Sequence, residues 1–76
     1  MHLKDFIKLH GYNYKSFALE TKLHPRSVEM WSRGERMPRW QDAEKIFNFT
    51  KGEVTGHDLY EKQIQFKKTI LQRNEI

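Results

Sequence analysis

The sequence predicts an all-α domain of five short helices, and three observations lead to this prediction. Gly and Pro residues divide the 76-residue chain into pieces of helical length. Apolar residues recur within each piece at the spacing of a helix with one buried face. Val, Ile and Thr are scattered, and the alternation typical of strands is nowhere sustained. We treat residues 1–76 as one domain, because a chain this short buries a single modest core.

The first two helices are expected at residues 2–10 and 14–21. Gly11 follows the first and predicts a left-handed C-cap, while Asn13 is a favourable N-cap for the second. The apolar side of the first helix comprises Leu3, Phe6, Ile7 and Leu9. The inner face of the second comprises Phe17 and Ala18.

A break at residues 22–24 separates the second helix from the third. Pro25 suits the first position of the third helix, where its missing N–H costs nothing, and Gly34 ends that helix. Val28 and Trp31 are expected to point inward.

The fourth helix is expected to begin near Pro38 or Arg39. Its predicted inner residues are Trp40, Ala43, Ile46 and Phe47. A fifth helix is expected from Gly56 to the region of Gln72, since Thr55 and Asp58 form a start signal close to a capping box.

Positive charge is concentrated in the middle of the chain. Fourteen Lys and Arg residues against ten Asp and Glu residues give a net charge of +4 and an isoelectric point near 9.5. Residues 22–39 carry +3 of this charge and all but one of the arginines. Because arginine suits both phosphate groups and guanine edges, this distribution indicates nucleic acid as a partner.

The segment FALETKLHPRSVEMWSRGERMP, residues 17–38, carries the most specific motif. It places small and apolar residues at the offsets that hold two helices together across a short turn. These residues are Phe17, Ala18, Leu23, Val28, Trp31, Gly34 and Pro38. Their ungapped spacing resembles the helix-turn-helix of the Cro/CI-type (lambda-repressor-like) family. The later segment TKGEVTGHDL, residues 50–59, is similar to the sequence after the fourth helix of small phage Cro-like repressors.

Two positions depart from the family pattern. Thr21 stands where the family has an apolar residue, and Lys22 stands where it has a glycine in the turn. A lysine can adopt the positive φ of that turn at a cost of about 1 kcal/mol. The departures leave open a differently shaped turn or an early end of the second helix.

The resemblance implies a sequence-specific transcriptional repressor, of a phage or prophage, that binds operator DNA as a homodimer in the cytoplasm of a bacterial or phage-infected cell. The third helix would lie in the major groove of double-stranded DNA. Its base-reading residues would be Pro25, Arg26, Ser27, Glu29, Met30 and Arg33. The phosphate-binding residues would be Lys15, Lys22, Arg36 and Arg39.

Two of these positions carry more specific expectations. Arg26 is expected to contact guanine O6 and N7. Glu29 has three alternatives: it accepts from a cytosine amino group, it orients Arg26 or Arg33 across one helical turn, or it is a surface carboxylate without a reading role.

Catalysis, metal binding and cofactors are not expected. The chain has no cysteine, and its four histidines show no zinc-like spacing. Its serines lack a base and an orienting group nearby in sequence, so we expect a protein that is not an enzyme. The amino-terminal residues lack the uninterrupted apolar stretch of a signal peptide or a membrane span.

Residues 55–76 are expected to contain the carboxy-terminal helix, a possible dimerisation segment, which has two main interpretations. Its apolar residues either complete the core or form a subunit interface, and a basic amphipathic membrane helix is a third alternative. The interface residues would be Ile64, Phe66, Ile70 and Leu71. Two rival functions use the same fold: a DNA-binding antitoxin whose tail holds a toxin, and a protein-interaction module without DNA binding.

Overall fold

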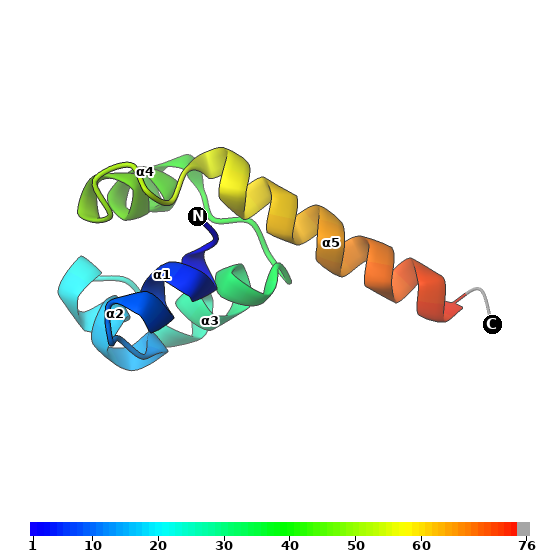
Figure 1. The fold of residues 1–76 in the computed structure, drawn as a ribbon, viewed down its shortest axis with the longest axis horizontal. Helices are drawn as coiled ribbons and strands as arrows, with labels where there is room; N and C mark the ends of the chain where they lie inside the picture. Colours follow the sequence, from blue (N-terminus) through cyan, green and yellow to red (C-terminus); the bar gives the residue numbers. More distant parts are fainter. Residues whose placement is uncertain (75–76) are drawn as a thin grey trace.

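The structure, a computed structural model, describes the backbone of residues 1–74 and the side chains of residues 1–70. Over residues 1–74 the chain forms five α-helices and no strand, which confirms the predicted all-α class (Figure 1). The helices are α1 Leu3–Leu9, α2 Tyr14–Thr21, α3 Pro25–Arg33, α4 Trp40–Phe49 and α5 Gly56–Asn74. No helix within residues 1–74 combines the length and apolarity needed to span a bilayer.

The core lies where α1 to α4 meet the start of α5. Its fully inaccessible apolar residues are Phe17, Ala18, Val28, Ile46 and Val54. Aromatic rings pack edge-on within it, and the centroids of Phe17 and Phe49 are 5.4 Å apart. Figure 1 shows α5 leaving this body and projecting beyond it, which accounts for the elongated 42 × 20 × 20 Å extent.

Helices α1 to α4 end in the same hydrogen-bonded turn. After α3, for example, the Glu35 N–H donates to the Met30 carbonyl at 2.9 Å, and the Gly34 N–H donates to Trp31 at 3.2 Å. This pair of bonds is the Schellman motif, which needs a left-handed residue one or two positions after the last residue of the helix. The left-handed residues that serve this role in the four turns are Gly11, Lys22, Gly34 and Lys51. The predicted glycine caps at Gly11 and Gly34 are therefore confirmed.

The inner face of α4 differs from the prediction. Trp40 is 71% exposed and Phe47 is also exposed, so neither belongs to the core. Ile46 is buried as expected, and Ala43 and Phe49 are the partly buried residues beside it. Residues 43, 46 and 49 repeat at helical spacing, whereas Trp40 and Phe47 lie more than a quarter turn from Ile46 around the helix.

Two smaller predictions also need correction. Leu9 is exposed, because it lies on the side of α1 opposite Ile7. Leu23, expected to cap the turn between α2 and α3 from the inside and to be buried, is only partly buried against the core. The first helix is one residue shorter at each end than expected, and α4 begins at Trp40 with Arg39 as its N-cap.

Candidate nucleic-acid interface

Helix α3 has two chemically different faces. Val28, Trp31 and Ser32 are buried, and the helix packs against α1, α2 and α5. The residues predicted to read bases are exposed or half-buried: Pro25, Arg26, Ser27, Glu29, Met30 and Arg33. The structure therefore brings all six together on the outer part of a single helix.

Local sequence determines where α3 begins. Pro25 occupies its first position, and His24 is the N-cap, with Nδ1 accepting a hydrogen bond from the Arg26 N–H at 3.2 Å. Sequence reasoning missed the role of His24, because histidine is not among the side chains that usually cap helices. Its place directly before a helix-starting proline was the available signal.

The turn before α3 contains a left-handed residue, Lys22. Helix α2 runs to Thr21 as predicted, and Lys22 adopts φ 59° and ψ 39°. The Leu23 N–H donates to the Ala18 carbonyl at 2.8 Å, which closes the turn. An early end of the second helix is therefore excluded, and Lys22 adopts the positive φ expected of that turn.

Thr21 is buried although it is polar. Its Oγ1 donates to the Phe17 carbonyl at 2.8 Å, so the hydroxyl is satisfied within α2. This local bond explains how the chain accommodates a hydroxyl group at a buried position.

The start of α2 is held by a reciprocal cap. The Ser16 N–H donates to Asn13 Oδ1 at 2.7 Å, and the Asn13 N–H donates to Ser16 Oγ at 2.9 Å. Lys15 lies in this first turn and is exposed, as are Lys22, Arg36 and Arg39. These four predicted phosphate-binding residues thus come from the start of α2, the turn before α3 and the loop after it.

Charge on the outer face of α3 is organised around Glu29. Its Oε1 lies 2.9 Å from Arg33 Nη2, and its Oε2 lies 3.9 Å from Arg26 Nη1. The arginine side chains are 54% and 69% exposed, whereas that of Glu29 is 26% exposed. The face therefore presents two cations with one carboxylate between them.

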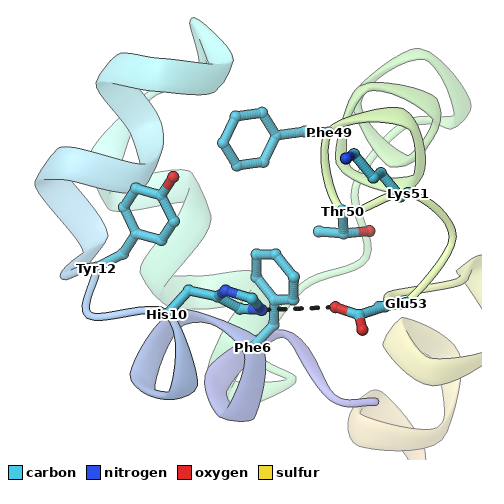
Figure 2. Close-up of a pocket in the computed structure, with 7 residues that line it drawn as sticks. All are labelled: Phe6, His10, Tyr12, Phe49, Thr50, Lys51 and Glu53. Carbon is cyan, nitrogen blue, oxygen red and sulfur yellow. Dashed lines mark ion pairs between the residues drawn. The ribbon is translucent and has the colours of Figure 1, made fainter.

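A separate pocket lies between α1 and the end of α4 (Figure 2). It is lined by Phe6, His10, Tyr12, Phe49, Thr50, Lys51 and Glu53. His10 Nε2 and Glu53 Oε2 face each other at 3.6 Å across its mouth. The lining contains none of the residues predicted to contact DNA. In the part of the chain that the structure describes, no three His, Asp or Glu side chains converge closely enough to hold a metal ion.

The interface residues expected at the carboxy terminus are spread along α5. Ile64 and Phe66 are half-buried, and Ile70 is exposed. The side chain of Leu71 lies outside the described residues. Leu59, in the first turn of α5, is buried in the core, so the start of this helix belongs to the body of the protein.

Comparisons with protein-family models, curated protein sequences and solved structures gave no significant match.

Proposed function

We propose that the protein is a sequence-specific DNA-binding repressor of the Cro/CI type that places α3 in the major groove of its operator. The observation that carries the proposal is the division of α3 into a buried apolar face and an outer face with two exposed arginines. An eight-residue helix and a three-residue turn precede it, the arrangement in which helix-turn-helix proteins present a recognition helix.

The surrounding cations support the same orientation. Lys15, Lys22, Arg36 and Arg39 flank α3 in sequence and are exposed. Phosphate contacts fix the register of a protein on the duplex, while base-edge contacts from the helix specify the sequence. Repression would be steric, through occupation of an operator that overlaps a promoter.

The experiment that tests this function separates base reading from phosphate binding. Sites are first selected from a random DNA pool with the wild-type chain. We expect Arg26→Ala to weaken the selected site by roughly 1–3 kcal/mol and to relax preference at one base pair. We expect Arg36→Ala to weaken selected and random DNA alike and to lower the salt slope by about one.

The proposal fails if the wild-type chain selects no sequence. Equal effects of Arg26→Ala on selected and random DNA would show that α3 does not read bases. Both variants alter exposed side chains, so circular dichroism should report an unchanged fold.

We further propose that the protein binds DNA as a homodimer through the projecting part of α5. A two-fold dimer would present its recognition helices to half-sites roughly 34 Å apart. Ile70 supports this placement, because it is an apolar residue of α5 that is 40% exposed.

Sedimentation equilibrium tests the dimer. We expect Ile70→Glu to produce a folded monomer, because a charge in an apolar interface is strongly unfavourable. Lys68→Glu places the same carboxylate at an exposed position nearly opposite Ile70 around α5 and should remain dimeric. A dimeric Ile70→Glu variant would place the interface elsewhere.

A further inference from the structure

Glu29 is the residue of the outer face of α3 that contacts both neighbouring arginines. It lies three residues after Arg26 and four before Arg33, the spacings at which side chains meet on a helix surface. Each carboxylate oxygen faces a different guanidinium group. Oε1 faces that of Arg33, and Oε2 faces that of Arg26. The 2.9 Å contact has the length of a charge-assisted hydrogen bond, and the 3.9 Å contact is longer and looser.

Stability does not account for this arrangement. Both arginine side chains are more than half exposed, and ion pairs that water reaches in this way contribute little to folding, because water screens them and the long side chains lose rotamer freedom. The pairing instead restricts the conformations that the arginine side chains can adopt. A flexible arginine loses substantial conformational entropy when it is ordered on a ligand, and a carboxylate that already holds it reduces that loss.

The same geometry bears on the direct reading of a base by Glu29. To accept a hydrogen bond from a cytosine amino group, an oxygen of Glu29 would have to share or leave its arginine. The three side chains together, two arginines and one carboxylate, also carry a net positive charge, which suits a surface that approaches DNA.

We infer that Glu29 is a positioning residue, which restrains Arg33, and more loosely Arg26, for contact with guanine edges. This inference rests on the proposed function.

Binding-site selection with wild type, Arg26→Ala, Arg33→Ala and Glu29→Ala tests the inference. Each arginine variant should lose one guanine preference. Glu29→Ala should reduce discrimination about fivefold at the guanine that Arg33→Ala affects, with a smaller reduction at the other, because bidentate arginine contacts carry such preferences. Glu29→Gln keeps an acceptor oxygen and should give an intermediate reduction.

Three outcomes of the selection would overturn the inference. If Glu29→Ala abolishes a cytosine preference that both arginine variants retain, Glu29 reads a base itself. If it leaves every position unchanged, Glu29 is a surface carboxylate. If the wild-type chain shows no sequence preference, the proposed function fails and the inference fails with it.

Nitrogen relaxation of the arginine Nε groups in the DNA-free protein gives a readout that is independent of selection. We expect Arg33 to be less mobile than Arg36, and Glu29→Ala to remove that difference. Glu35→Ala, which deletes an exposed carboxylate of the same region, should leave the mobility of Arg33 unchanged. A wild-type Arg33 as mobile as Arg36 would overturn the positioning role even if DNA binding is specific.

Discussion

The turn before α3 and the turn after it have the same backbone conformation but different tolerance for a side chain. Lys22 precedes α3 with φ 59°, and Gly34 follows it with φ 84°. Each turn is closed by a bond of similar length, from Leu23 to Ala18 at 2.8 Å and from Glu35 to Met30 at 2.9 Å.

The difference lies in what surrounds each residue. Lys22 is exposed to solvent, so its side chain meets nothing that would exclude it. A Cβ on Gly34 would come within 2.7 Å of the Lys62 carbonyl carbon, in the backbone of α5. A positive φ therefore costs a lysine some strain, whereas close approach by another helix requires glycine outright. The missing side chain of Gly34 is thus what allows α5 to pack closely against the end of α3.

Gly34→Ala should have the largest effect on stability. The added methyl group combines the strain of positive φ with a steric clash against backbone that cannot rotate away. We therefore expect the free energy of unfolding to fall by about 2–5 kcal/mol. Chemical denaturation at neutral pH measures it. A loss no larger than that of Gly11→Ala would mean that α5 does not pack against Gly34 as described.

Gly11→Ala isolates the strain without the collision. Gly11 has φ 74°, and a Cβ there would have no described atom within 4 Å. We expect a loss of about 1 kcal/mol, because the cost of positive φ is partly offset by reduced freedom of the unfolded chain. A loss equal to that of Gly34→Ala would show that the conformation, and not the contact with α5, determines both results.

Lys22→Gly should act in the opposite direction. Glycine removes the strain but increases the freedom of the unfolded chain, so we expect a net gain of about 0.5 kcal/mol. Lys22→Ala is the matched control, because it removes the same charge and keeps the strain. The Gly and Ala variants should bind DNA equally weakly if Lys22 contacts phosphate, although they differ in thermal stability.

Acidification should have the smallest effect on stability. It acts through Asp58, which lies in the first turn of α5. Burial disfavours the ionised form of Asp58 and by itself would raise its pKa. Hydrogen bonds from the Thr55 N–H, the amino-terminal ammonium and the Thr55 hydroxyl outweigh this effect of burial. They hold the pKa of Asp58 below its ordinary value of 3.8. A lowered pKa stabilises the fold above the unfolded-state value, and this contribution is lost as the pH falls through the folded-state value. Stability measured from pH 6 to pH 2 should therefore fall more steeply for wild type than for Asp58→Asn. Parallel curves would contradict the role of Asp58 in fixing α5.

Much of the candidate site follows from local sequence. Asn13, Pro25 and Gly34 determine the ends of α2 and α3, since capping depends on side chains and backbone within a few residues. The inward positions of Val28 and Trp31 follow from helical period, and the outward position of the six predicted reading residues follows with them. The spacing of Glu29 from the two arginines allowed their pairing, but the distances that favour Arg33 came from the structure.

Tertiary structure decided what the sequence left ambiguous. Helix α4 has apolar residues on more than one side, and Phe49 rather than Trp40 faces inward because it meets the rings of Phe17 and Tyr12. Neither ring is near Phe49 in sequence, so helical period could not select between the faces. The same reason applies to Gly34, which the motif predicted as a cap. Gly34 also lets the backbone of Lys62 approach closely. This contact depends on where α5 packs, and contacts between distant segments form only when the core is assembled.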